Sequence, residues 1–291
     1  MNAHVKGLIM LLRLPYWMMS GGLALLTAFA ITKGIFGFET VLLIFFSMSF
    51  ITSAGFAVND YFDRESDAVI KPKRPIPAGS LSLKQVVAAA VILFALGLSF
   101  AVFIDLLSFV ILLIDSVLLL LYSAFVKRKS GFAANVLVGL LVGTAFIYGE
   151  ASVAPHTVSI ISLSLYPIAC GTIGGNVLRD ILSLDGDSKI GYPTLPQKIG
   201  NSKSVKIAAF FFITTGVLAP LPYALSEFTM YYLLLILLWS IILIYSSIRL
   251  VTSAATVENV RKHERLITMS MMLLPLSLIL EALSPVIGGL L

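Results

Sequence analysis

Charged residues are scarce in this sequence of 291 residues, of which only 12% are Asp, Glu, Lys or Arg. A water-soluble domain has about 25% charged residues, whereas here 58% of the residues are hydrophobic and the mean hydropathy is +1.00. This composition excludes an ordinary soluble domain and indicates an integral membrane protein.

Cysteine and histidine are also scarce. Cys170 is the one cysteine, so an intrachain disulfide is excluded, and its apolar surroundings predict a packing role. The three histidines, His4, His156 and His263, are scattered and lack the spacing of metal ligands. No small-residue cleavage pattern follows the N-terminus, so we expect the first apolar run to be retained as a membrane span.

Long apolar runs, in contrast, recur from one end of the chain to the other. A helix needs about 20 residues to cross about 30 Å of hydrocarbon, and the membrane interior admits only helices or closed barrels. The sequence predicts an all-α integral membrane fold, one domain over residues 1–291, with a tight turn near Asp105. The nine predicted spans lie near residues 14–32, 38–58, 84–104, 106–126, 133–152, 157–178, 205–224, 228–250 and 266–290.

The distribution of basic residues predicts the orientation of these spans, because Lys and Arg concentrate on the cytoplasmic side of membrane proteins. With nine spans, the N-terminal segment and the loops after spans two, four, six and eight share one side. They hold all of the 20 Lys and Arg residues except Lys33. We therefore expect a multi-pass protein of the cell membrane with its N-terminus and these loops in the cytoplasm and its C-terminus outside.

The loop after span two carries a cluster of acidic residues. Asn59, Asp63 and Asp67 are four residues apart, so they share one face of a helix that continues from the span. Carboxylate and amide oxygens suit a hard cation such as Mg²⁺, which shares a few carboxylates with substrate phosphates. These residues and the adjacent Asp60 are candidate metal ligands.

A second acidic loop follows span six, four crossings later, and therefore faces the same compartment. Asp180 and Asp187 are seven residues apart, which is two helical turns, and they share a face that excludes Asp185. Two carboxylate clusters facing each other would repel unless metal ions lay between them. We therefore predict metal bridges with a diphosphate between the clusters.

Basic residues flank both acidic loops and end span four. Arginine suits bidentate contact with phosphate oxygens and lysine acts as a point charge. Departure of diphosphate from an allylic carbon requires such electrostatic stabilisation, so some of these residues are expected to bind the diphosphate. The candidates are Arg64, Lys73, Arg74, Lys127, Arg128, Arg179 and Lys189.

Asp115 lies deep within span four, about two helical turns before Tyr122. An intramembrane carboxylate is a functional candidate because its burial costs several kcal/mol. A structural hydrogen bond to a neighbouring helix is an equally open interpretation. Glu150 ends span five at the opposite membrane face, where we expect a solvated helix end.

Two pairs of glycines have the spacing of close helix contacts in membranes. Gly139 and Gly143, and likewise Gly171 and Gly175, follow the small-xxx-small pattern. We expect tight helix packing at these positions rather than a nucleotide-binding loop.

The acidic motifs resemble those of the UbiA superfamily of intramembrane prenyltransferases, and the resemblance extends over essentially the whole chain. Asn59-Asp60-x-x-Asp63-x-x-x-Asp67, followed by Lys73-Arg74-Pro75-Ile76-Pro77-Ala78-Gly79, resembles the family's first signature. Asp180 to Asp187, with Gly191 and Thr194-Leu195-Pro196, resembles the second. Leu121-Tyr122-Ser123 before Lys127-Arg128 is similar to the end of the fourth family helix.

The resemblance implies nine helices around a central cavity with a lateral opening to lipid. It also implies two Mg²⁺ ions that hold a prenyl diphosphate, and transfer through an allylic carbocation that an acceptor attacks. Asn176 thereby joins the candidate metal ligands and Arg13 the candidate diphosphate-binding residues. The candidate catalytic residues are Asp63, Asp180, Asp115 and Tyr122.

Two branches of the family are compatible with these motifs. The first motif is similar both to archaeal digeranylgeranylglyceryl phosphate synthases and to chlorophyll-synthase-like members. The archaeal lipid enzymes usually have Glu where this chain has Asn176 and Asp where it has Ser183, and Ser183 with Asp185-Gly186-Asp187 is more similar to the second branch. The segment Arg13-Leu14-Pro15-Tyr16-Trp17 also lacks the usual Asn.

We therefore expect Mg²⁺-dependent transfer of a polyprenyl group, of geranylgeranyl type, from its diphosphate to a lipophilic acceptor. The acceptor is either an aromatic or quinone precursor or geranylgeranylglyceryl phosphate. The expected partners are these two substrates and membrane lipid, without nucleic acid. A cation-coupled transporter is the alternative, because carboxylates such as Asp115 bind ions near the midplane of transporters. A CDP-alcohol phosphotransferase would need an Asp-Gly and Ala-Arg arrangement that the sequence lacks.

Overall fold

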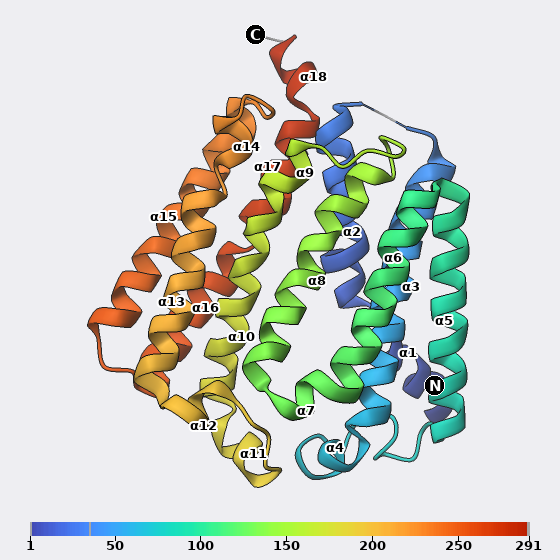
Figure 1. Cartoon of the computed structure of the whole chain (residues 1–291), viewed down its shortest axis with the longest axis vertical. Coiled ribbons are helices and arrows are strands. Elements are labelled where there is room, and N and C mark those ends of the chain that lie inside the picture. The colour runs from blue at the N-terminus through green and yellow to red at the C-terminus, as the bar shows by residue number, and fades with distance from the viewer. Residues whose placement is uncertain (1, 35, 290–291) are drawn as a thin grey trace.

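The computed structural model describes residues 2–34 and 36–289, and within these residues every regular element is helical. The long helices run roughly along the longest axis of the molecule (Figure 1). Nine helical segments of the described residues are long and apolar enough to cross a membrane. This confirms the predicted all-α membrane fold.

The first five of these segments are built from α1 (Ala3–Leu12) and α2 (Pro15–Thr32); α3 (Phe38–Phe62), followed by the short α4 (Arg64–Ile70); α5 (Leu83–Ile104); α6 (Leu106–Leu121) with the π-helical turn η1 (Tyr122–Val126) and α7 (Lys127–Lys129); and α8 (Gly131–Ala151). The other four are built from α9 (Ile160–Leu165), the 3-10 turn η2 (Tyr166–Ala169) and α10 (Cys170–Leu182), followed by the short α11 (Leu184–Lys189) and α12 (Leu195–Ile199); α13 (Asn201–Leu218) with α14 (Leu221–Ala224); α15 (Met230–Thr252); and α16 (Val257–Ser270) with α17 (Leu273–Ala282) and α18 (Ser284–Gly288).

Local sequence signals explain several helix ends. Asp105 ends α5 and begins α6, where its carboxylate accepts a hydrogen bond from the Leu107 N–H at 3.0 Å. This is an N-cap, and it confirms the predicted tight turn. Arg13 has a left-handed backbone (φ 49°, ψ 52°) and Pro15 occupies the first position of α2, a place that proline favours. The first segment is therefore two helices with a break between them.

The ninth span begins earlier than predicted. It runs from Val257 to Ala282, whereas the hydropathy of the sequence placed it at 266–290. The charged residues of α16 lower the hydropathy there, yet the helix starts at this point because the Thr256 side chain accepts a hydrogen bond from the Asn259 N–H at 3.2 Å.

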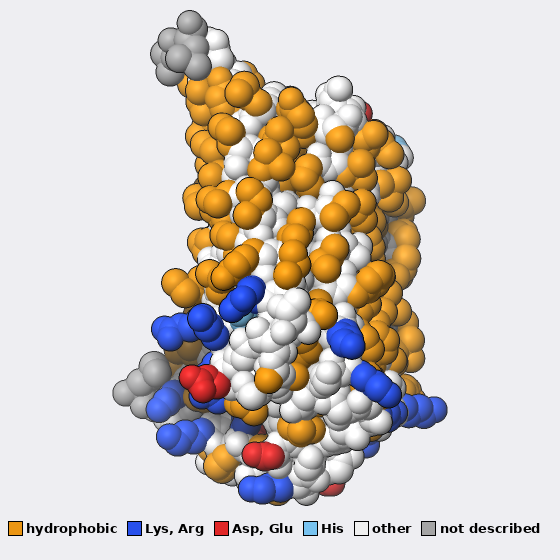
Figure 2. Space-filling view, turned by 90° about the vertical axis from the view of Figure 1, so that its left-hand side faces the viewer, with side chains coloured by type: hydrophobic (Ala, Val, Ile, Leu, Met, Phe, Trp, Pro, Cys, Tyr) orange, Lys and Arg blue, Asp and Glu red, His pale blue; other side chains and the backbone are white. Residues whose placement is uncertain are grey.

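The two ends of the bundle differ in character. The short helices α4, α11 and α12 lie at the lower end in Figure 1, and α14 and α18 lie at the upper end. On the face drawn in Figure 2, hydrophobic side chains cover the upper part, whereas Lys and Arg gather toward the lower end. Both acidic segments therefore lie at the end where the basic residues gather.

Buried carboxylates fasten the loops of the opposite end. Glu150 is only 2% exposed and accepts hydrogen bonds from the Ser159 N–H at 2.8 Å and from the Ser159 and Ser162 hydroxyls. The expected solvated helix end at Glu150 is therefore wrong, because the loop into α9 folds back and covers the carboxylate. Glu281 is buried in the same way and is bound by Thr229 and Lys33.

The glycine pair on α8 allows the close helix contact that its spacing predicts. A Cβ atom on Gly139 would collide with the Ile173 side chain, and one on Gly143 would lie 2.7 Å from the Tyr166 ring. The second pair behaves differently, since a Cβ atom on Gly175 would have no neighbour within 4 Å. The prediction of tight helix packing is therefore confirmed for the first pair, and it is wrong for Gly175.

Candidate active site

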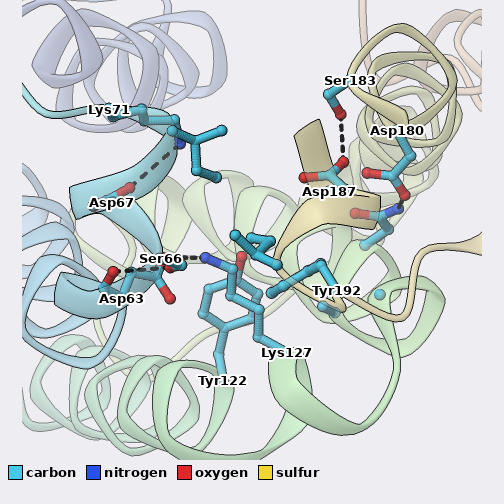
Figure 3. Close-up of a pocket in the computed structure, with 15 residues that line it drawn as sticks. Asp63, Ser66, Asp67, Lys71, Tyr122, Lys127, Asp180, Ser183, Asp187 and Tyr192 are labelled. Carbon is cyan, nitrogen blue, oxygen red and sulfur yellow. Dashed lines mark hydrogen bonds and ion pairs between the residues drawn. The ribbon is translucent and has the colours of Figure 1, made fainter. Parts of the chain in front are cut away.

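The two acidic segments face each other across a cavity of about 180 Å³ (Figure 3). The short helices α4 and α11, which contribute to its walls, lie at the lower end of the bundle in Figure 1. One wall comes from the junction of α3 with α4 and the other from the junction of α10 with α11. The cavity is lined by Asp63, Ser66, Asp67, Ile70, Lys71, Tyr122, Lys127, Gly131, Ala134, Asn135, Asp180, Ser183, Asp187, Ile190 and Tyr192.

The first wall keeps a helical repeat although α3 ends at Phe62. The N–H of Asp63 donates to the Asn59 carbonyl, and the N–H of Asp67 donates to the Asp63 carbonyl, both at 2.8 Å. This repeat of four residues brings Asp63 and Asp67 to the same side, as predicted. The Lys127 ammonium pairs with the Asp63 carboxylate and also donates to the Asn59 amide oxygen at 3.3 Å.

Asp67 is the more deeply buried carboxylate of this wall, with 3% of its surface exposed. Burial raises the pKa of its carboxyl above the ordinary value, and the Lys71 ammonium opposes the shift in pKa. The Lys71 Nζ lies 3.8 Å from the Asp67 Oδ1. A cation near this carboxylate therefore favours its ionised form.

The second wall presents two carboxylates that each accept a hydrogen bond. Asp180 accepts one from the Asn135 side-chain amide on α8 at 2.8 Å. Asp187 accepts one from the Ser183 hydroxyl at 2.5 Å. The second wall thus resembles the first in presenting carboxylate oxygens, but it is held by neutral donors instead of ammonium groups.

Two tyrosines complete the cavity. Tyr122 begins the π-helical turn η1 at the end of span four, and π-helical turns are frequent at functional sites. Tyr192 follows α11, and its ring centroid lies 5.3 Å from the Lys127 Nζ. Burial, together with Tyr122 and the carboxylates of Asp63, Asp180 and Asp187, raises the pKa of the Tyr192 hydroxyl, so it remains protonated.

The donor set fits a hard divalent cation that also binds a ligand. Within residues 2–34 and 36–289, no three His, Cys, Asp or Glu side chains come together as a ready cage for one ion. The lining instead offers carboxylate oxygens on opposite walls. Mg²⁺ commonly binds through one or two carboxylates and completes its coordination with water and phosphate oxygens, which suits this arrangement.

Three predicted site residues form a separate cluster outside the cavity lining. Asp60 is 2% exposed, and its Oδ1 accepts hydrogen bonds from Arg13 at 2.6 Å and Arg74 at 2.7 Å. Arg13 also lies over the Phe56 ring, 4.2 Å from its centroid. The structure therefore places Asp60 in an ion-pair cluster, where two guanidinium groups already occupy one of its oxygens.

The remaining predicted basic residues also lie outside the described lining of the cavity. Arg64 donates to the Tyr61 carbonyl at 3.0 Å, and Arg128 donates to the Phe62 carbonyl at 2.9 Å. Both arginines thereby fasten the last turn of α3. The others are Lys73, Lys189 and Arg179, which donates to the Asn176 side-chain oxygen at 3.2 Å and to Glu264 at 3.4 Å.

Asp115 lies between helices and does not line this cavity. It is 3% exposed and accepts a hydrogen bond from the Thr144 hydroxyl on α8 at 2.7 Å. This is the interhelical hydrogen bond that the structural interpretation of Asp115 predicts. A catalytic role for this residue stays a prediction.

Several lining residues were not among the predicted site residues: Ser66, Lys71, Asn135, Ser183 and Tyr192. Spacing alone would have pointed to Lys71 and Ser183, which lie four residues from Asp67 and Asp187 on a helical face. Asn135 carried a weaker signal, as an amide near the start of a membrane span. Tyr192 had none, because only the chain path after α11 brings it to the cavity.

The part of the chain that the structure describes has nine helical segments able to cross a membrane and two acidic walls that face each other at one end. This arrangement defines a membrane protein that can hold a cation together with an anionic ligand. The chain belongs to the UbiA prenyltransferase family, whose profile matches residues 20–274. The protein is therefore a membrane-embedded prenyltransferase. This confirms the predicted reaction class, and the transporter alternative has no further support.

The chain is similar to curated archaeal relatives. It is 34% identical over 233 residues to the digeranylgeranylglyceryl phosphate synthase of Natronomonas pharaonis, covering 80% of this chain and 83% of that protein. It is 35% identical over 194 residues to the enzyme of the same name from Methanococcoides burtonii, covering 67% and 69%.

Solved structures are similar over a larger share of the chain. One, described as a study of digeranylgeranylglyceryl phosphate synthase in membranes, has a TM-score of 0.83 at 27% identity and covers 97% of this chain and 99% of that one. A UbiA homologue from Archaeoglobus fulgidus, solved with DMAPP and Mg²⁺, has a TM-score of 0.68 at 19% identity and covers 91% and 98%. The latter likeness concerns the fold alone.

Proposed function

We propose that the protein transfers a geranylgeranyl group from geranylgeranyl diphosphate to geranylgeranylglyceryl phosphate. The products are digeranylgeranylglyceryl phosphate and diphosphate. The identity of about one third to archaeal enzymes named for this product supports the choice of acceptor over an aromatic or quinone precursor. It outweighs the departures from the archaeal pattern at Asn176 and Ser183.

The observation that carries the proposed chemistry is the pair of facing acidic walls. Asp63 and Asp67 on one side and Asp180 and Asp187 on the other line a single cavity. Carboxylates so arranged would repel a diphosphate unless cations lay between them. We infer two Mg²⁺ ions, one associated with each wall. Bound there, Mg²⁺ would neutralise diphosphate oxygens and stabilise the departing anion.

The residues of the cavity suit the transfer step itself. When the bond between C1 of the prenyl chain and the diphosphate oxygen breaks, its electron pair leaves with the diphosphate. The acceptor hydroxyl oxygen then supplies the pair for the new C–O bond, and its proton leaves with the released diphosphate. Lys127 and Lys71 supply positive charge beside the departing group, which is the stabilisation that such a step needs.

The membrane supplies the hydrophobic part of the site. Both substrates have long hydrocarbon chains. The cavity is lined by residues of α4 and α11, and these helices lie at one end of the bundle of membrane helices (Figure 1). The chains can thus stay in the bilayer while their charged ends react near its surface. The excess of Lys and Arg at this end supports a cytoplasmic location of the acidic segments (Figure 2).

Incubation of the purified protein with radiolabelled geranylgeranyl diphosphate, Mg²⁺ and each acceptor separately tests this function. We expect labelled digeranylgeranylglyceryl phosphate from the glycerol phosphate acceptor and no labelled product from an aromatic quinone precursor. The opposite result would assign the protein to the aromatic branch. Full activity after removal of Mg²⁺ with a chelator would contradict the metal site.

A further inference from the structure

The hydroxyl of Tyr192 is a hydrogen-bond donor without a partner in the candidate active site. Its oxygen is buried, and no acceptor lies within hydrogen-bond reach among residues 2–34 and 36–289. The side chain lines the same cavity as the carboxylates of both walls. A buried donor without an acceptor is unfavourable. Inside a ligand cavity, it points to an acceptor that arrives with the ligand.

Four of the other donor side chains of this cavity already have acceptors within the protein. Their hydrogen bonds hold the acidic walls in place and leave these donors less free to bind a ligand. They are Asn135 on Asp180 at 2.8 Å, Ser183 on Asp187 at 2.5 Å, Ser66 on the Asp63 carbonyl at 2.8 Å, and Lys127 on Asp63 and Asn59. Tyr192 differs from all of these.

The chain holds Tyr192 firmly between the two walls. Its N–H donates to the Asp187 carbonyl at 2.9 Å, and its carbonyl accepts from the Thr194 N–H at 2.8 Å. Its ring lies within cation–π distance of the Lys127 ammonium, at 5.3 Å. Tyr192 thus extends from the second wall toward the cation that pairs with the first (Figure 3). The proposed diphosphate would lie in this gap.

We propose that Tyr192 is a catalytic residue whose hydroxyl donates a hydrogen bond to the diphosphate of the donor while the C1–O bond breaks. This rests on the donor site of the proposed function and not on the identity of the acceptor. The phenol keeps its proton throughout, since the electron pair of the broken bond goes to the diphosphate oxygen and the acceptor's proton leaves with the diphosphate. A fixed donor stabilises the growing negative charge on the oxygen that it faces.

Tyr192→Phe tests the proposal because it removes the hydroxyl and keeps the ring beside Lys127. We expect kcat to fall about 10- to 100-fold, as for loss of a hydrogen bond to a charged group. We also expect weaker binding of inorganic diphosphate in the presence of Mg²⁺, measured by calorimetry, with an unchanged KM for the acceptor. Tyr166→Phe is the matched control, because its hydroxyl donates to the Leu140 carbonyl at 3.0 Å away from the cavity.

A third variant separates the hydrogen bond from ring packing. Tyr192→His keeps a flat ring with an N–H donor, so we expect it to retain more activity than Tyr192→Phe. Values of kcat and diphosphate affinity for Tyr192→Phe within about twofold of wild type would overturn the proposal. Equal losses in the Phe and His variants, with equal drops in thermal unfolding temperature, would also overturn it, because packing would then be the cause.

The diphosphate measurement also separates this proposal from the choice of acceptor. Wild-type protein that does not prenylate geranylgeranylglyceryl phosphate, but binds Mg²⁺ and diphosphate in a manner that depends on the Tyr192 hydroxyl, would contradict the proposed acceptor. The same result would support the assignment of Tyr192.

Discussion

The ammonium of Lys127 pairs with the carboxylate of Asp63 and donates to the Asn59 amide oxygen at 3.3 Å. This contact joins α7, at the end of span four, to the last turn of α3. Lys127 and Asp63 are mostly buried, with 18% and 14% of their side chains exposed. The same carboxylate is a candidate ligand for Mg²⁺, so lysine and metal compete for its negative charge.

Lys127→Met should therefore lower the Mg²⁺ concentration that the enzyme needs and raise the KM for the prenyl donor. Without the ammonium, Asp63 attracts Mg²⁺ more strongly, and the half-saturating Mg²⁺ concentration should fall about 3- to 10-fold, equivalent to about 1 kcal/mol. The diphosphate loses a cation, so the KM for the donor should rise about tenfold. Steady-state kinetics with separate titrations of metal and donor measure both effects.

Lys129→Met is the control for this pair of effects, because Lys129 lies on the same short helix and is exposed outside the cavity lining. It should leave both constants near their wild-type values. A parallel rise of both constants in Lys127→Met would show that the lysine supports the fold of the site instead of competing with metal.

The second acidic wall allows a similar comparison within one short helix. Asp187 lines the cavity and accepts the Ser183 hydroxyl, whereas Asp185 is exposed and does not line it. Asp187→Asn should lower turnover at least about 100-fold and raise the Mg²⁺ requirement, because an amide is a weaker ligand for a hard cation. Asp185→Asn should behave like wild type. Equal activity of both variants would remove Asp187 from the metal site.

The predictable part of the site was the part encoded by helical spacing. The four-residue repeat of Asn59, Asp63 and Asp67 survives in the backbone hydrogen bonds across the α3–α4 junction, so these residues share a side as expected. The number of spans, nine among the residues that the structure describes, followed from hydropathy and from the one-sided distribution of Lys and Arg, although hydropathy placed the ninth span too late in the chain.

The parts that the sequence did not reveal depend on chain path and competing partners. Asp60 belongs to the first motif, yet Arg13 and Arg74 reach it from the N-terminal break and from the loop after α4. Tyr192 carries no motif signal and reaches the cavity through an irregular segment. The sequence places Glu150 at a helix end that should be solvated, whereas in the structure the following loop covers its carboxylate. Tertiary contacts decided each case.

Because Asp60 lies in an ion-pair cluster, we expect its substitution to lower the stability of the protein without changing metal binding. Asp60→Asn would leave two guanidinium groups without their shared carboxylate, and breaking such a buried pair costs about 3 kcal/mol. We expect a lower thermal unfolding temperature in detergent and reduced activity with an unchanged Mg²⁺ half-saturation. A large rise in the Mg²⁺ requirement, as expected for Asp187→Asn, would instead return Asp60 to the metal ligands.

Glu281 is expected to stabilise the fold without affecting the active site. It lies in the last turn of α17, and α17 lies toward the opposite end of the bundle from α4 and α11 (Figure 1). It is fully buried, accepts hydrogen bonds from the Thr229 N–H at 2.9 Å and hydroxyl at 2.7 Å, and lies 3.0 Å from the Lys33 ammonium. Glu281→Ala should destabilise the protein by about 2 to 4 kcal/mol, since the buried donors lose their acceptor. Kinetic constants at a temperature where the variant is folded should stay close to wild type.

The exposed Glu39 provides the control, as Glu39→Ala should change neither property. A selective change in the donor KM of Glu281→Ala at that temperature would mean that the two ends of the bundle are coupled.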